Sequence, residues 1–185
     1  MKRPLIVAVL LVALATPALA DGGHIGLYVD AAFTDCAFVD FMGQVVIVYV
    51  VHQLSPAVNA SQFRVTIDGY AGILVSVDFP ILYIEAPDIF AGDTVPYATC
   101  EATPYVLATF SLLSMGTSPE CASFQVVADP HTGGEAVLAF DCEGGTLTAT
   151  GGTLVVNPTV DCVCTVGAES ASWSLIKSLY ATEGR

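Results

Sequence analysis

The segment VVIVYVV, residues 45–51, is the longest unbroken apolar run after residue 20. Its β-branched and aromatic side chains favour strands over helices. The run lacks the alternation of apolar and polar residues that marks a half-exposed strand. It is therefore typical of a central strand that is covered on both faces. We expect residues 45–51 to lie in the middle of a β-sheet.

The segment SQFRVTID, residues 61–68, shows a second strand pattern. Phe63, Val65 and Ile67 alternate with polar residues, as in a strand with one face in the core. Residues 86–104 are richer in Pro, Gly and Asp, and we expect a loop with a short edge segment there. Further short apolar segments lie at 24–30, 73–79, 106–113, 122–127, 136–140, 146–150 and 153–156.

Many short strands separated by turn residues predict an all-β fold. The expected architecture is a single antiparallel β-sandwich of about eight to ten strands. Gly151-Gly152, between the last two segments, fits the two-residue turn of a β-hairpin.

The first twenty residues have the pattern of a secretory signal peptide. Lys2 and Arg3 precede an apolar run at 5–14, and Ala18-Leu19-Ala20 is a small-x-small cleavage site. We expect export to the periplasm, the cell surface or the medium, with no membrane span after cleavage. The expected domains are the signal peptide at 1–20, a disulfide-stapled sandwich at 21–168 and a helical tail at 169–185.

The tail is expected to contain one short helix. Trp173, Ile176 and Tyr180 recur at i, i+3 and i+7, which places them on one apolar stripe. A helix this short is marginal alone, so the stripe needs a surface to cover. It either docks on the sandwich or serves as a sorting or attachment handle.

Six cysteines follow the signal peptide, and they are expected to form structural disulfides in an oxidising compartment. The pairs that the strand pattern favours are Cys36–Cys100 and Cys121–Cys142. A zinc site formed by the remaining cysteines and a distant histidine is the alternative. The six residues are Cys36, Cys100, Cys121, Cys142, Cys162 and Cys164.

The chain is acidic, with a formal net charge of −13. Nucleic acid and anionic membrane surfaces would repel such a chain, whereas divalent cations or a basic partner would be attracted. Asp30, Asp35 and Asp40 lie in one expected loop and are candidate calcium ligands. The alternative is that these carboxylates are simply solvated, and no other cofactor is expected.

Catalytic motifs are absent from the sequence. His24, His52 and His131 do not have the spacing of metal ligands, and no Gly-x-Ser-x-Gly segment is present. We therefore do not expect an enzyme.

Three segments resemble a group of uncharacterised secreted proteins from environmental Gram-negative bacteria. They are GLYVD at 26–30 followed by Cys36, ASQFRV at 60–65, and CTVGAE at 164–169 with WSLIKSLY at 173–180. The resemblance implies a β-sandwich and export. The second segment is also similar to a strand of cohesin-like sandwiches, at the level of fold alone. Cys162 is additional to the pattern of the group.

These features favour a non-catalytic binding or structural module of the cell envelope or the medium, with a protein or glycan partner. One alternative is a carbohydrate-binding module, which would expose a row of aromatic side chains. A second is a surface protein whose C-terminal helix is the attachment handle. The candidate sugar-binding aromatics are Tyr28, Tyr70, Tyr83, Tyr97 and Tyr105.

Export gives the first testable prediction. Signal peptidase should remove residues 1–20, so mass spectrometry of the natively exported protein should find Asp21 at its N-terminus. An exported protein that retains Met1 would contradict it.

Overall fold

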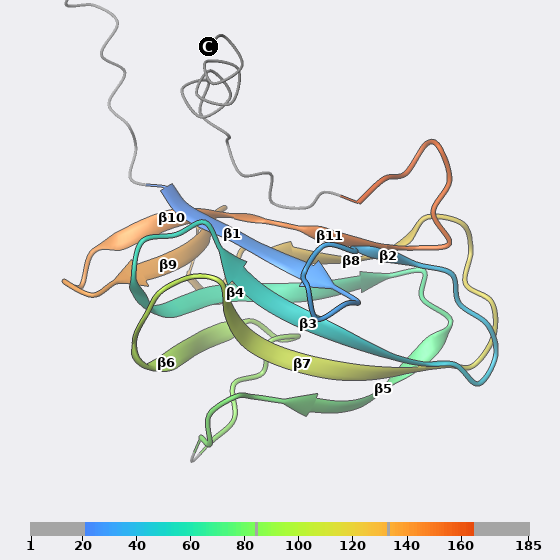
Figure 1. Cartoon of the computed structure of the whole chain (residues 1–185), viewed down its shortest axis with the longest axis horizontal. Helices are drawn as coiled ribbons and strands as arrows, with labels where there is room; N and C mark the ends of the chain where they lie inside the picture. The colour runs from blue at the N-terminus through green and yellow to red at the C-terminus, as the bar shows by residue number, and fades with distance from the viewer. Residues whose placement is uncertain (1–20, 84, 133, 165–185) are drawn as a thin grey trace, which may run out of the picture.

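The computed structural model describes residues 21–83, 85–132 and 134–164, which form eleven β-strands and one short 3-10 helix (Figure 1). The strands are β1 (Asp21–Tyr28), β2 (Ala37–Phe38), β3 (Val45–Gln53), β4 (Val58–Asp68), β5 (Gly72–Asp78), β6 (Asp93–Glu101), β7 (Tyr105–Ser114), β8 (Ala122–Val127), β9 (Val137–Asp141), β10 (Thr146–Gly151) and β11 (Thr153–Val156). The 3-10 helix spans Pro130–Thr132.

Two of the predicted segments fall outside the described residues. They are the signal peptide at 1–20 and the helix at 169–185, with Trp173, Ile176 and Tyr180. Within the described ranges, no helix is long and apolar enough to cross a membrane.

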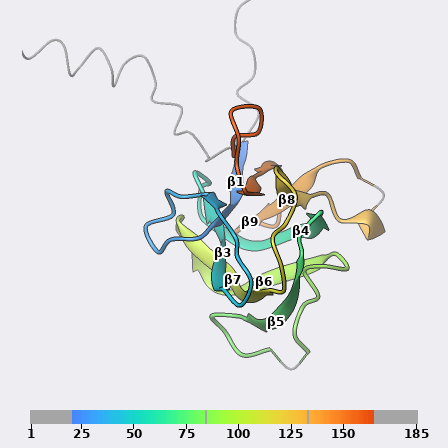
Figure 2. The same ribbon diagram turned by 90° about the vertical axis from the view of Figure 1, so that its right-hand side faces the viewer.

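The strands form two layers that are joined along one hydrogen-bonded path. The order is β2-β11-β8-β4-β9-β10-β1-β3-β7-β5, and β6 pairs with β4. Strand β4 belongs to both layers, because its first half pairs with β9 and its second half with β8. Figure 2 shows β3 and β7 on one side of the core and β4 and β8 on the other.

The sheet is mixed rather than purely antiparallel, which corrects the sequence-based expectation. β1 runs parallel to β10, and β2 runs parallel to β11, while the other pairs are antiparallel. Both parallel pairs join a strand near the N-terminus to one late in the chain. A long separation of this kind does not force the antiparallel direction that a short hairpin imposes. The expected eight to ten strands also become eleven, partly because β6 occupies much of the predicted loop.

Gly151-Gly152 is not a hairpin turn, because β10 and β11 do not pair with each other. The chain instead passes from one layer to the other at this point. A Cβ atom on Gly151 would lie only 1.9 Å from the carbonyl oxygen of Val126, so the close approach requires glycine. The backbone N–H of Val126 donates to the Gly152 carbonyl at 3.0 Å, and this bond holds the crossing against β8.

The main core lies between the layers. Phe110 of β7 and Phe124 of β8 meet across it, with ring centroids 6.0 Å apart. Phe63 and Val65 are buried as the alternating pattern of β4 predicts, whereas Ile67 is partly exposed near the end of that strand.

Strand β3 departs from the expectation of cover on both faces. Val46, Val48 and Val50 point into the core and are buried. On the opposite side, 63% of Val45 and 48% of Ile47 remain exposed. The strand is central in the sheet, between β1 and β7, but only one of its faces is covered at this end.

All six cysteines lie in disulfides, but both expected pairs are wrong. β8 pairs with β4 and β11 rather than with β9, so Cys121 before β8 and Cys142 after β9 belong to different layers. Because Cys162 and Cys164 both form disulfides, they do not form the alternative zinc site. The observed pairs are Cys36–Cys164, Cys100–Cys142 and Cys121–Cys162.

The disulfides give a prediction about stability. Replacing both cysteines of a pair by serine should destabilise the protein by roughly 2–4 kcal/mol. The sequence separation is 128 for Cys36–Cys164, against 42 and 41 for the other two pairs. Loop-closure entropy then makes loss of Cys36–Cys164 the most costly, by about 1 kcal/mol. Chemical denaturation of the three double variants measures this order, and an equal cost for all three would contradict it.

Candidate interaction surface

An apolar face forms on the outer side of β3, β7 and β5, at the end where β3 begins. Val45 lies opposite Leu113 of β7, and Leu113 lies opposite Ile73 of β5, so the three side chains form one row across the strands. We define the apolar face as Phe41, Met42, Val45, Ile47, Ile73, Val75, Leu113 and Met115.

The adjoining loops extend this face past the ends of the strands. The Gly43 N–H donates to the Ser114 carbonyl at 2.8 Å, and the Ser114 N–H donates to the Gln44 carbonyl at 2.9 Å. The Met115 N–H donates to the Ala71 carbonyl at 2.9 Å. These bonds fix the loops that carry Phe41, Met42 and Met115. The sequence carries a signal for these residues, because large apolar residues beside turn glycines are unusual in solvated loops.

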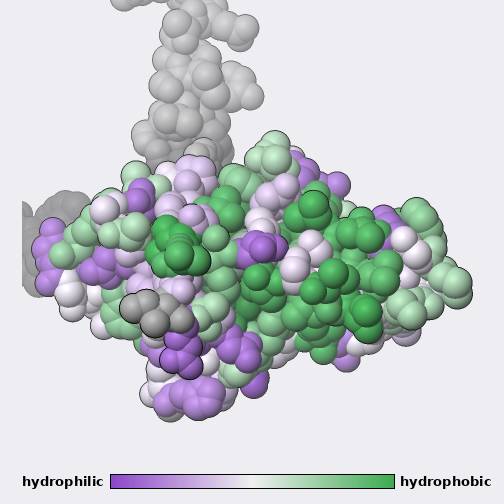
Figure 3. Space-filling model, turned by 90° about the horizontal axis from the view of Figure 1, so that it is seen from below, coloured by the Kyte–Doolittle hydropathy of each residue, from purple (hydrophilic) through white to green (hydrophobic). Residues whose placement is uncertain are grey.

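The face is large and uncharged. The three segments that carry it, residues 41–47, 71–77 and 110–116, contain no Asp, Glu, Lys or Arg at all, although the whole chain has a net charge of −13. Figure 3 shows apolar side chains gathered over this end of the molecule. Their exposed area is on the order of 800 Å², above the 300–600 Å² of the largest patch on a typical monomer. Exposed apolar patches of this size are typical of interaction surfaces.

A small hollow lies near the other end of β5. It has a volume of about 130 Å³ and is lined by Asp78, Phe79, Pro80, Val106 and Thr109. Pockets for small organic ligands have volumes of about 300–1,000 Å³. The hollow is therefore too small to hold such a ligand.

The other half of the same outer side is covered by the loop between β1 and β2. Tyr28, Cys36 and Val51 form a second buried cluster there, separate from the main core. The residues packed against it are Phe33, Tyr49, Val106 and Cys164. The Cys36–Cys164 disulfide fastens this cover to the chain that follows β11. Tyr49 is the last residue of β3 that this loop covers, and the apolar face begins two residues away, at Ile47.

The candidate calcium ligands do not form a common site. Asp30 organises its own loop, accepting hydrogen bonds from the backbone of Ala32, Thr34 and Asp35 at 3.2, 2.9 and 2.7 Å. Burial raises the pKa of Asp30, but these bonds outweigh it and hold the pKa below its usual value. Within the described ranges, no three His, Cys, Asp or Glu side chains are grouped to hold a metal ion.

Asp40 lies in a different network from Asp30 and Asp35. It is buried and accepts hydrogen bonds from Ser118 Oγ at 2.6 Å and from Asn157 Nδ2 at 2.7 Å. Burial raises the pKa of Asp40, but the bonds from Ser118 and Asn157 lower it by more, so the pKa lies below its usual value. The carboxylate thus joins the loops at the ends of β2, β7 and β11.

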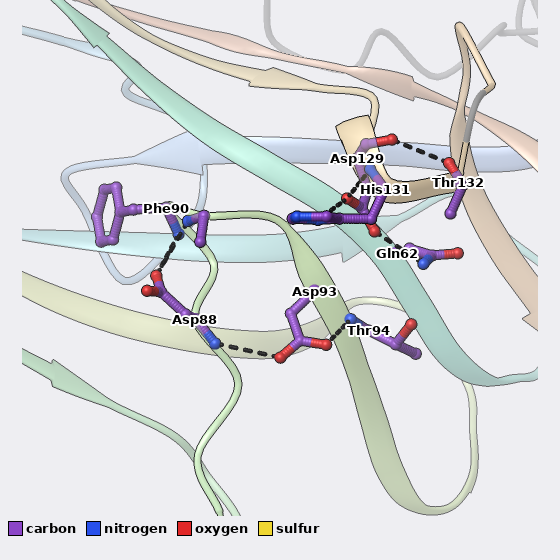
Figure 4. Close-up of polar contacts among 9 residues, drawn as sticks. Gln62, Asp88, Phe90, Asp93, Thr94, Asp129, His131 and Thr132 are labelled. Carbon is purple, nitrogen blue, oxygen red and sulfur yellow. Dashed lines mark hydrogen bonds and ion pairs between the residues drawn. The ribbon is translucent and has the colours of Figure 1, made fainter.

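Asp129 has a similar structural role beside the 3-10 helix. It accepts hydrogen bonds from His131 Nδ1 at 3.0 Å and from Gln62 Nε2 at 2.8 Å (Figure 4). Burial raises the pKa of Asp129, but its bonds to His131 and Gln62 lower it overall.

Beside this network, at the start of β6, the Asp93 carboxylate accepts a long hydrogen bond of 3.4 Å from the Asp88 N–H.

One serine–histidine contact was not anticipated from the sequence. His52 Nε2 donates to the Gly22 carbonyl at 2.6 Å, which leaves Nδ1 to accept from Tyr97 Oη at 2.8 Å. Ser61 Oγ lies 3.1 Å from the same Nδ1. His52 and Ser61 have no exposed surface, and Tyr97 has almost none. A nucleophile sealed in this way does not meet a substrate, so the network holds β1, β3, β4 and β6 together.

The tyrosines proposed for sugar binding do not form an exposed row. Tyr28 and Tyr97 are buried, and Tyr105 packs against Tyr97 with ring centroids 4.7 Å apart. Tyr70 packs against Phe124 of the core at 5.2 Å. Tyr83 is half-buried against Phe79, at 5.3 Å. These five rings serve packing within the domain.

Comparisons with known proteins add little to this description. No protein-family model matches the chain, and no curated protein matches its sequence. Among the solved structures that are similar is a cohesin module from Clostridium perfringens ATCC13124 family 33 glycoside hydrolase. The TM-score is 0.48 at 10% identity, over 73% of this chain and 98% of that module. Similarity at this level assigns neither a family nor a partner.

The buried histidines predict a dependence of stability on pH. Burial lowers the pKa of both His24 and His52 in the folded protein. In the unfolded chain these histidines have pKa values of about 6.5. Below that pH the unfolded chain takes up protons that the folded protein does not.

The free energy of unfolding should therefore fall as the pH drops from 7.5 to 5, by up to about 1.4 kcal/mol per pH unit for each histidine. Asp30, Asp40 and Asp129 have lowered pKa values, so their contribution is present above about pH 4 and is lost only below it. Denaturant titrations across this range measure the effect, and equal stability at pH 7.5 and pH 5 would contradict it.

Proposed function

We propose that this chain is an exported, non-catalytic module that binds another protein through its apolar face. The observation that carries the proposal is the mismatch in β3. Its sequence is that of a strand covered on both faces, and the described residues cover only one of them at Val45 and Ile47. An intermolecular contact supplies the missing cover.

The rest of the molecule supports a binding role rather than a catalytic one. The serine–histidine contact is sealed in the core, and the hollow near β5 is too small for a small-molecule substrate. The three disulfides suit a protein that works in an oxidising compartment, where thermal and proteolytic stress are not relieved by refolding. An apolar sheet face with a polar surround is the anatomy of a protein–protein interface.

The test is capture of partners from the envelope and secreted fractions of the native organism. The baits are the full-length mature protein and two variants, Ile47→Asp on the apolar face and Leu82→Asp as a control. Leu82 is fully exposed, so the control adds the same charge outside the face. A carboxylate buried without a partner disfavours binding strongly. We expect the wild type and Leu82→Asp to retain the same bound protein, and Ile47→Asp to lose it.

Both variants should keep the melting temperature of the wild type within a few degrees, because both side chains already contact solvent. Identical capture by all three baits would refute the proposed role of the face. Capture by none of them would refute the binding function itself.

A further inference from the structure

We propose that the partner on the apolar face is a second copy of this chain, which packs the same face against it about a two-fold axis. This inference rests on the proposed function, because it names the partner of that surface. Its supports are the area of the face, the absence of charge on it and the open edge at β5.

The area fits a dimer. The face exposes on the order of 800 Å², which equals the contribution of one partner to an interface of standard size. Two such faces packed together would bury at most about 1,600 Å² in total. Outer faces of β-sheets are flat enough to stack at about 10 Å, as the layers of a sandwich do.

The distribution of charge favours a second copy of this chain as the partner. Without Lys2 and Arg3 of the signal peptide each chain carries a net charge of −15, so two copies repel one another over most of their surface. In a two-fold interface each residue lies near its own copy or that of a neighbour, so a charged face would place like charges together. The apolar face brings no carboxylates together. A basic partner, in contrast, would gain nothing from a face without carboxylates.

Strand β5 adds a separate observation. It ends the strand order, so one of its backbone edges is unpaired within the described part of the chain. The segment ILV at 73–75 is exposed, and β5 has neither proline nor lysine to protect that edge. Edge strands of this composition are prone to uncontrolled association. A closed two-fold contact on the apolar face buries the exposed side chains of Ile73 and Val75 beside that edge.

The experiment is sedimentation velocity of the oxidised mature protein, residues 21–185, from about 1 µM to about 100 µM, where micromolar affinity changes the populations. We expect a concentration-dependent shift from monomer to dimer. Ile47→Asp and Met115→Asp should each weaken the dimer roughly 100-fold or more, because every dimer then buries two unpaired carboxylates. Leu82→Asp should dimerise like the wild type.

Salt provides a second readout. Raising the ionic strength screens the repulsion between acidic copies, so the apolar dimer should become tighter with added NaCl. An interface held by ion pairs would weaken under the same change. Weakening by salt would overturn the proposed contact.

The only tryptophan in the chain, Trp173, tests the competing occupant. Residues 165–185 follow Cys164, which is fastened to the covered half of the same outer side, so the tail is within reach of the face. If all proteins are monomeric and Ile47→Asp red-shifts the Trp173 emission, the tail covers the face and the dimer is refuted.

Two further outcomes separate this inference from the proposed function. A monomeric wild type that retains a different protein in the capture experiment overturns the dimer and leaves the binding function intact. Self-association that neither Ile47→Asp nor Met115→Asp changes places the contact elsewhere and also overturns the inference.

Discussion

The crossing of the chain at Gly151 is the constraint on which the two layers depend. The backbone there approaches the Val126 carbonyl so closely that no side chain fits. The crossing lets one continuous segment supply β10 to one layer and β11 to the other. β1 then lies in parallel beside β10, and the ring of His24 lies beside Gly152 at the crossing. The first and tenth strands are thereby paired, with β3, β7 and β5 following in the same layer.

As a result, only one half of the outer side of the layer formed by β1, β3, β7 and β5 is covered. The loop between β1 and β2 folds back over one half and is held there by Asp30 and by the Cys36–Cys164 disulfide. It does not cover the start of β3, where Val45 and Ile47 remain in solvent. Burying apolar area is favourable at roughly 25 cal/mol per Å², so a partner that covers this half gains a substantial driving force. That gain must exceed the cost of bringing two molecules together.

The polar groups of the domain are largely committed to its architecture. Asp40 and Asp129 are buried carboxylates whose hydrogen bonds join loops and strands. His52 and Ser61 form the sealed network beneath β1. Groups that are engaged in this way are poor candidates for chemistry, which requires an exposed and adjustable partner. The acidic surface favours solubility, and contact is the role that we propose for the uncharged face.

The sequence by itself determined the all-β class, the burial of Phe63 and Val65 on one face of β4 and the engagement of all six cysteines in disulfides. These features depend on local composition and on side-chain alternation, which can be recognised in short segments of the sequence. Only the tertiary structure decided the parallel pairs, the disulfide partners and the role of Gly151, because each joins segments far apart in the chain. The apolar face belongs to both categories. Val45 and Ile47 belong to the apolar run at 45–51, but the residues of β5 and β7 that join them on one face, and the extent of the loop after β1 that covers the other half, are set by the fold.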